Sequence, residues 1–383
     1  MSLHVAVVGA GVFGAWTATH LQRAGHRVTL IDAWGPAHSR SSSGGESRLT
    51  RAAYGRDAIY TRMARDSLAE WKALSRRCEL PIFHECGVLF FFPRSEPYFE
   101  ETVAAHAEAG LPTEVLTRRD LEQRFPMFDF DGVEIGLFEP GFGALIAQRA
   151  VQTLVEEFVQ AGGAYLQGAV DPPDADADEL NEIRLSNGES IAADSFVFAA
   201  GAWLPKLFPD VVGSRIRPTR QEVFLFAPAP GDGRFLPAEM PGWADFSDGD
   251  MFYGFPDLEG RGVKLAHDIH GPEVDPDTQD RRFSEAALAD VVAYRDRRFP
   301  ALRGAQLTEA RVCQYENSSN GDFLVDFHPR WRNVLLVGGG SGHGFKHGPE
   351  VGRHAAGRLL GSAAPKARFS LATKSETHHR EVH

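Results

Sequence analysis

The sequence predicts an α/β protein in which a discontinuous, Rossmann-like nucleotide-binding domain carries an inserted, mostly antiparallel β-sheet domain of α+β character. Three observations predict this arrangement. The chain starts with a strand, a Gly-rich turn, a helix and a second strand; a strand, Gly-rich turn and helix recur near residues 333–360; and strand-like alternation dominates residues 215–268. At 383 residues the chain exceeds one ordinary core, so two domains are expected.

The first elements are marked most clearly. Residues 4–8 are an apolar run, residues 12–24 have helical spacing, and residues 27–31 are a second apolar run that ends in Asp32. The Ser/Gly/Pro-rich stretch 35–47 that follows is too long to be a mere connector.

Hydrophobic spacing and Gly or Pro punctuation predict the later elements. Helices are expected at 57–77, 96–109, 119–125, 145–161, 284–298 and 349–360. Strands are expected at 87–92, 164–170, 221–226, 251–255, 263–266, 307–315 and 333–337.

These elements suggest domain boundaries. We expect residues 1–80, 146–215 and 321–361 to form the nucleotide-binding domain, and residues 81–145 and 216–320 to form the substrate domain. The remaining segment, 362–383, is expected to be a loosely held tail without a metal site.

Composition excludes several classes of protein. The chain has 40 basic and 52 acidic side chains, a net charge of −12, which argues against binding to nucleic acid. Apolar runs stay well short of the roughly 18 to 20 residues of a membrane span, and the first residues do not resemble a secretion signal, so a cytoplasmic protein is expected. Cys78, Cys86 and Cys313 have neither disulfide nor metal-site spacing, and no metal is expected.

The Gly-rich turn at the start fits a dinucleotide fingerprint. Gly9 would permit the tight turn, Gly11 would let a pyrophosphate approach the backbone, and Gly14 would let helix and strand pack closely. Asp32, 18 residues after Gly14, suits a ribose diol. The fingerprint alone leaves FAD and NAD open.

Several charged or reactive side chains lie near predicted element ends. Arg48 and Arg51, three apart, would share one face of a first helical turn and could bind an anion, unless both are simply solvated. Lys264 lies within an apolar strand, where the simpler interpretation is that it points to water, and Cys313 in another strand could be an ordinary buried thiol. The turn before Lys346 is a natural anion site.

Taken together, these motifs resemble one family, that of monomeric sarcosine oxidase and N-methyltryptophan oxidase. The resemblance runs in order from the first strand to about residue 360. It is carried by the glycine fingerprint with Asp32, Gly45-Glu46-Ser47-Arg48 with Arg51 and Ala53-Tyr54-Gly55, Gly201-Ala202-Trp203, Tyr253-Gly254-Phe255-Pro256, Lys264, Val312-Cys313-Gln314-Tyr315, Asp326-Phe327-His328-Pro329 and Ser341-Gly342-His343-Gly344-Phe345-Lys346.

The resemblance implies FAD and the two-domain amino-acid-oxidase fold. Cys313 matches the position where the family attaches the flavin through a thioether, and Arg48 matches an arginine close to the flavin ring. The turn of Gly340, Gly342 and Gly344 would face the flavin pyrimidine. The full set of residues expected at the cofactor is Gly9, Gly11, Gly14, Asp32, Arg48, Val170, Gly201, Cys313, Gly340, Gly342 and Gly344.

The resemblance also implies residue roles in catalysis. Lys264 matches the lysine that promotes reduction of oxygen, and Arg48 and Tyr315 are expected beside it as catalytic residues. Arg51 and Lys346 match the pair that holds the substrate carboxylate. Tyr253 and Tyr315 match tyrosines of the substrate pocket.

The sequence departs from the family pattern at two places. Ser43 and Gly44 replace histidines that often precede the Gly-Asp/Glu-Ser/Thr-Arg segment. Four residues after Lys264, a pocket histidine of sarcosine oxidase is replaced by Asp268, although a shift of one residue would put His267 there. Asp268 would favour a cationic amine or a hydroxylated substrate arm, or lie in a solvated loop; both remain open.

The resemblance predicts FAD-dependent oxidation of a small secondary amino acid, such as sarcosine, to an imine that is then hydrolysed, with O2 reduced to H2O2. Alternatives are a fructosyl amino acid oxidase, a flavin dehydrogenase with another acceptor, a nicotinamide-dependent dehydrogenase and a non-catalytic flavin protein. We expect a monomer whose partners are the amino acid and O2.

Overall fold

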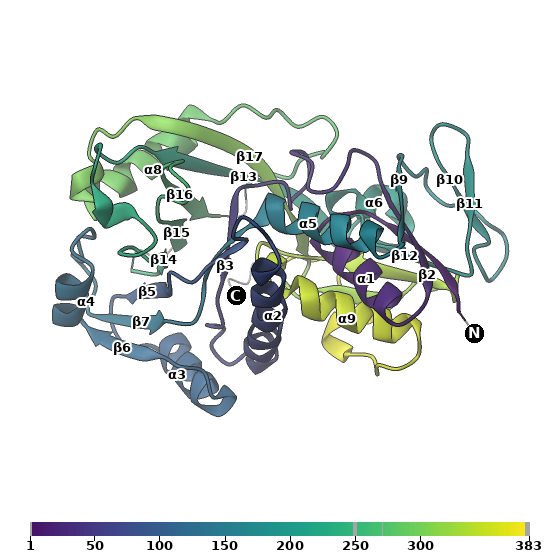
Figure 1. Cartoon of the computed structure of the whole chain (residues 1–383), viewed down its shortest axis with the longest axis horizontal. Coiled ribbons are helices and arrows are strands. Elements are labelled where there is room, and N and C mark those ends of the chain that lie inside the picture. Colours follow the sequence, from purple (N-terminus) through teal and green to yellow (C-terminus); the bar gives the residue numbers. More distant parts are fainter. Residues whose placement is uncertain (1, 248–250, 270, 380–383) are drawn as a thin grey trace.

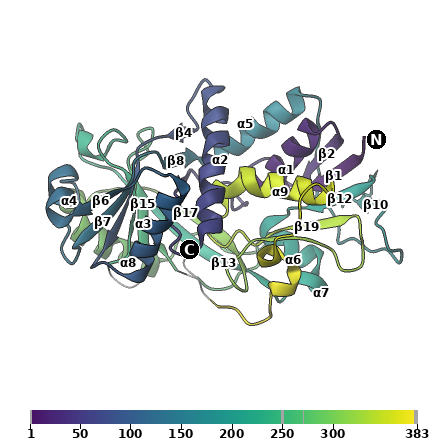
Figure 2. The same cartoon turned by 90° about the horizontal axis from the view of Figure 1, so that it is seen from below.

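The computed structural model describes residues 2–247, 251–269 and 271–379. Within these residues, the two largest β-sheets have six and eight strands. In Figure 1 the sheet that contains β14, β15 and β16 lies on the left, and the sheet that contains β1, β2 and β12 lies on the right. Helix α2 (Ala58–Arg76) stands between them in this view and in the perpendicular view of Figure 2.

The first large sheet takes strands from the start, middle and later part of the chain. Its order in the described residues is β18-β19-β12-β1-β2-β9, and the pairs are parallel except β18 with β19. The chain leaves β1 toward β2 on one side, whereas β12 lies on the other. Nucleotides bind at the carboxyl edge beside such a switch point. The strands are β1 His4–Val8, β2 Arg27–Asp32, β9 Ala164–Gln167, β12 Ser195–Phe198, β18 Leu324–Phe327 and β19 Val334–Gly338.

The second large sheet is antiparallel apart from the pair β5 with β14. Its order in the described part of the chain is β17-β13-β16-β15-β14-β5-β7-β6. Its two long strands, β13 and the edge strand β17, run from this sheet toward the first one (Figure 1). The bounds are β5 Val88–Phe92, β6 Glu114–Thr117, β7 Ile135–Glu139, β13 Ile216–Phe226, β14 Gly242–Asp245, β15 Met251–Phe255, β16 Val263–Asp268 and β17 Leu307–Ser318.

Helices cover both sheets. In the first sheet's domain, α1 packs against α5 and α9; in the second, α8 packs on β13 and β16. The N-terminus of α4 has the capping box of Thr117 and Asp120, which satisfies two backbone donors. The other helices are α1 Val12–Arg23, α3 Pro97–Ala109, α4 Arg118–Arg124, α5 Ala147–Gln160, α6 Leu204–Leu207, α7 Pro209–Val212, α8 Glu285–Arg298 and α9 Gly348–Leu359. A small hairpin joins β10 Glu182–Arg184 to β11 Ser190–Ala192.

The predicted fold class is confirmed, and the division at the stated residues stays a prediction. One local expectation was wrong: Arg48 does not begin a helix. Ser47–Thr50 forms β3, which pairs with β8 (Gly143–Ile146), while β4 (Phe83–His84) pairs with the other edge of β8. The pairing partner lies about a hundred residues away, so local spacing could not reveal it.

Within the segment expected to be a loose tail, residues 367–374 are held in place. Phe369 is fully buried, and Arg368 forms ion pairs of 2.5 Å with both Asp57 and Asp322. The Lys374 ammonium group donates to the Arg368 carbonyl. Residues 367–374 therefore pack against the first domain, next to the start of α2.

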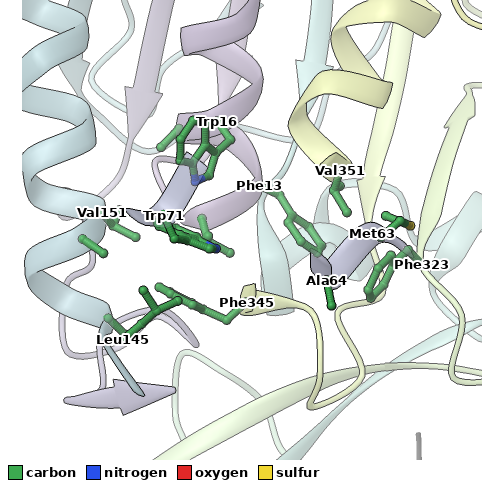
Figure 3. Close-up of a cluster of buried hydrophobic side chains, with 14 of the residues drawn as sticks. Phe13, Trp16, Met63, Ala64, Trp71, Leu145, Val151, Phe323, Phe345 and Val351 are labelled. Carbon is green, nitrogen blue, oxygen red and sulfur yellow. The ribbon is translucent and has the colours of Figure 1, made fainter. Parts of the chain in front are cut away.

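The helix α2 is joined to the first domain by Trp71. The ring is stacked on Phe345 at 5.6 Å, meets Trp16 edge-on at 5.3 Å, and its Nε1 donates to the Lys346 carbonyl at 2.9 Å (Figure 3). Trp71 thereby positions the backbone that carries Lys346. Within the described residues, no helix is long and apolar enough to cross a membrane.

We predict that Trp71→Ala lowers the free energy of unfolding by about 3 to 5 kcal/mol, because it leaves a cavity and removes a hydrogen bond. Urea denaturation followed by circular dichroism would measure the change. Leu80→Ala, at a side chain that is 59% exposed, is the control and should change stability by about 0.5 kcal/mol or less. Equal effects of the two variants would contradict the prediction.

Candidate active site

Two neighbouring cavities lie where the carboxyl edge of the first sheet meets the second sheet. The first has a volume of about 370 Å³ and the second of about 110 Å³. Six residues line both cavities, so the two are adjacent: Ser41, Arg48, Cys313, Tyr315, Gly342 and Phe345.

The glycine fingerprint forms one wall of the first cavity. Gly9 has a φ of +105°, and a β-carbon there would lie 2.3 Å from the Ala199 carbonyl oxygen. A β-carbon on Gly14 would lie 1.8 Å from the Gly9 oxygen, so Gly14 serves helix packing and does not line the cavity. At Gly11 the nearest atom would be the Ser43 hydroxyl at 3.5 Å, which leaves room for a ligand. The N-terminus of α1 points here and suits a pyrophosphate.

Asp32 lies at the end of β2 and also lines the first cavity. One carboxylate oxygen accepts the Ala10 N–H at 2.8 Å, and the other accepts N–H groups of Trp34 and Gly35 at 2.9 Å. These bonds fix the carboxylate, and the oxygen that accepts only the Ala10 N–H has a second lone pair that can accept a ribose hydroxyl.

The other residues expected at the cofactor also lie at the first cavity. They are Arg48, Val170, Gly201, Cys313, Gly340, Gly342 and Gly344. The predicted strand at 164–170 ends earlier, at Gln167, and Val170 instead forms an isolated bridge with Leu185. The cavity therefore combines a pyrophosphate cradle with a ribose acceptor, which fits a dinucleotide cofactor.

Lys264 lies at the second cavity, so the interpretation that it points to water was wrong. Its side chain is buried, and its ammonium group donates to the Ser47 carbonyl and hydroxyl at 3.3 Å. Burial lowers the Lys264 pKa to about 8, against the opposing attraction of the Glu46 carboxylate 3.8 Å away. Lys264 therefore gives up its proton at a lower pH than an exposed lysine.

Glu46 also belongs to this cluster, although its sequence motif did not mark it as a functional residue. It is buried, and its second oxygen lies 2.5 Å from Arg311. Burial disfavours the carboxylate, but the charges of Lys264 and Arg311 outweigh this and lower the Glu46 pKa. Its place two residues before Arg48 was the available signal, but sequence does not show that an acid will be buried between two cations.

Arg51 and Lys346 both line the second cavity, and both are buried. The guanidinium group lies 4.4 Å, and the ammonium group 5.3 Å, from the ring centre of Tyr54. The Lys346 ammonium group also donates to the His343 carbonyl at 2.9 Å. Burial and the charge of Arg51 hold the Lys346 pKa well below its usual value. Two cations on one small cavity form a site for an anion.

Glu139 lies behind this pair, and the sequence did not reveal it. It is fully buried, accepts the Ala52 N–H at 3.0 Å, and lies 3.3 Å from His106. Burial raises the Glu139 pKa to about 8, although the Ala52 N–H and the charge of Arg51 act in the opposite direction. Glu139 thus fixes the backbone immediately after Arg51.

The tyrosines and the acid expected in the substrate pocket also meet at the second cavity. Tyr253 and Tyr315 are hydrogen-bonded to each other, and burial followed by the charge of Asp268 raises the Tyr253 pKa to about 12. Asp268 lines the cavity, on the same strand face as Lys264. His267 instead pairs with Asp290 at 2.7 Å. Of the two positions left open, Asp268 faces the pocket.

Comparison with known proteins places this geometry in a family. A family model described as FAD dependent oxidoreductase matches residues 4–358. Monomeric sarcosine oxidase from Bacillus sp. (strain B-0618) is 31% identical over 361 residues, covering 92% of this chain and 91% of that protein. N-methyl-L-tryptophan oxidase from Salmonella heidelberg (strain SL476) is 30% identical over 372 residues, covering 94% and 95%.

Solved structures agree on the fold. A modified fructosyl peptide oxidase from Aspergillus nidulans superposes with a TM-score of 0.84 at 20% identity, covering 96% of this chain and 93% of that one. The family match decides between the two dinucleotides in favour of FAD and sets aside the nicotinamide and non-catalytic alternatives. The chain belongs to the family of FAD-dependent oxidoreductases.

Proposed function

We propose that the protein oxidises a small secondary amino acid, such as sarcosine, to an imine that water hydrolyses, while O2 is reduced to H2O2. The observation that carries this proposal is the buried pair Arg51 and Lys346 in a cavity that adjoins the cofactor cavity. Two cations there bind a substrate carboxylate and orient the amine toward the shared wall.

FAD would be held in the first cavity by the glycine turn, Asp32 and the turn of residues 340–344. Bound there, FAD supplies the oxidising power by accepting two electrons and a proton from the amine. Arg48, at the shared wall, contributes a positive charge. Its guanidinium group is held in place because it donates hydrogen bonds to the backbone carbonyls of Ser42 and Ser47.

Lys264 is assigned to the oxygen half of the reaction. Its ammonium group is held near the shared wall by Ser47 and Glu46. A buried cation stabilises the negative charge that appears when oxygen takes an electron, and it does so with little reorganisation. Glu46 supports this role by favouring the charged form of the lysine.

The size of the second cavity favours a small substrate. Its volume is about 110 Å³, against about 370 Å³ for the cofactor cavity. A second candidate, a fructosyl amino acid, is favoured by Asp268, whose carboxylate can accept hydrogen bonds from sugar hydroxyls. A flavin dehydrogenase would differ in its electron acceptor. The expected monomer and cytoplasmic location stay predictions.

Cys313 is assigned as the attachment point of the flavin, because it lines both cavities and is partly exposed. A thioether would replace the S–H bond of the cysteine and one C–H bond of the flavin 8α methyl group. Two electrons and two protons would leave as the bond forms, and O2 would accept them as H2O2.

The experiment that tests this function is an absorbance spectrum before and after acid precipitation, followed by anaerobic addition of amines. We expect the yellow colour to stay with the pellet, and sarcosine, L-pipecolate or L-proline to bleach the flavin. In Cys313→Ser the colour should pass to the supernatant, whereas the control Cys86→Ser should behave as the unaltered protein. Bleaching by a fructosyl amino acid alone would support the second candidate. Failure to consume oxygen would indicate a dehydrogenase.

Arg51→Ala should weaken binding of substrate and of simple carboxylate inhibitors alike, by about ten- to a hundredfold, because a charge-assisted hydrogen bond is lost. Flavin absorbance titrations with acetate and propionate would measure the inhibitors directly. Arg56→Ala, at an exposed arginine outside both cavities, is the matched control. Unchanged affinity for the carboxylates would remove the assignment.

Lys264→Met should slow reoxidation of the reduced enzyme by O2 about a hundredfold, with a much smaller effect on reduction. The cationic form is populated below the Lys264 pKa of about 8, so reoxidation by the unaltered protein should slow as pH rises through that value. Stopped-flow measurements of both half-reactions across pH test this, with Lys72→Met as control. Equal slowing of the two half-reactions would contradict the role.

A further inference from the structure

Glu316 is a buried carboxyl group in the cofactor cavity to which the reaction above gives no role. It lies on β17 directly after Tyr315, and its side chain lines the first cavity. One of its oxygens, Oε1, accepts the Gly339 N–H at 2.8 Å. Burial raises the Glu316 pKa to about 7, against the opposing effect of the N–H groups of Gly339 and Gly340. A buried ionisable group costs stability unless hydrogen bonds compensate for its burial, and a bound ligand could supply such a bond.

The carboxyl group lies between two turns of the first sheet. A β-carbon on Gly338, at the end of β19, would be 2.3 Å from Oε1. A β-carbon on Gly201, in the turn after β12, would be 3.9 Å from Oε2. Glu316 therefore lies beside the carboxyl ends of both strands.

The strand order indicates which half of FAD lies there. The pyrophosphate cradle follows β1, and the ribose acceptor Asp32 ends β2. Because β12 and β19 lie on the opposite side of β1 from β2, the riboflavin half of FAD extends toward them. That half carries ribityl hydroxyl groups, which donate hydrogen bonds, whereas a carboxyl group would repel the phosphates.

We propose that Glu316 is a cofactor-binding residue whose carboxyl oxygen accepts a hydrogen bond from a ribityl hydroxyl group of FAD. This inference rests on the proposed placement of FAD in the first cavity. A glutamine at this position would still accept the Gly339 N–H through its carbonyl oxygen, but its amide nitrogen cannot accept a second hydrogen bond.

The test is a cycle that combines Glu316→Gln with FAD analogues lacking the 2′, 3′ or 4′ ribityl hydroxyl. Cys313→Ser serves as the background so that binding stays reversible, and flavin fluorescence gives the dissociation constants. Removing the Glu316 charge should change the affinity for FAD and for each of the three analogues by the same factor. We therefore expect the ratio of Glu316→Gln to Glu316 dissociation constants to be about tenfold larger for FAD than for one of the three analogues.

Equal ratios for all four flavins would overturn the inference and leave Glu316 as a cap for Gly339. Should Glu316→Gln fail to fold, the dissociation constants of the protein with Glu316 serve as the test. One analogue must then bind about tenfold more weakly than FAD. If all three analogues bind as tightly as FAD, the inference is overturned. Asp32→Ala tests the placement of FAD separately from the role of Glu316. If it leaves FAD affinity unchanged, the placement of FAD is wrong; if it weakens FAD while the ratios are equal, only the role of Glu316 fails.

Discussion

The arrangement of this molecule depends on the burial of several cations around one small cavity. Arg51, Lys264 and Lys346 are each withdrawn from water, which is costly unless opposite charges are nearby. Glu46, also buried, supplies such a charge 3.8 Å from Lys264, whereas Glu139 accepts the Ala52 N–H next to Arg51. The cavity thus keeps enough positive charge to attract an anion, while these contacts reduce the cost of burying that charge.

This electrostatic arrangement requires both sheets. The second sheet provides Lys264 and Glu139 at strand positions, and the three-stranded sheet of β3, β4 and β8 provides Glu46 and Arg51 at the two ends of β3. The turn between β19 and α9 adds Lys346. Because the packing of Trp71 on Phe345 holds that turn against α2, the position of Lys346 depends on the core of the first domain.

Sequence predicted the elements with strong periodicity, and several residues of distinctive motifs lie at the two cavities, although their roles stay predictions. The glycine turn, Asp32, Lys264 and Cys313 all lie at the cavities, as the family resemblance implied. Arg48 was placed on a helix because its strand partner is distant, and the segment after residue 361 was thought loose because Arg368 meets Asp57 and Asp322 only in the folded chain. Glu46 and Glu139 were overlooked because burial beside a cation has no local signature.

The discontinuous first sheet also affects how the protein is made on the ribosome. The glycine turn is synthesised first, but the strand beside β12 and its antiparallel neighbour come from residues 324–338. Arg368, which ties the start of α2 to Asp322, follows later still. During synthesis the second sheet can close while the first still lacks one edge. A nascent chain arrested before β19 is made would therefore expose the unpaired edge of β12 to aggregation.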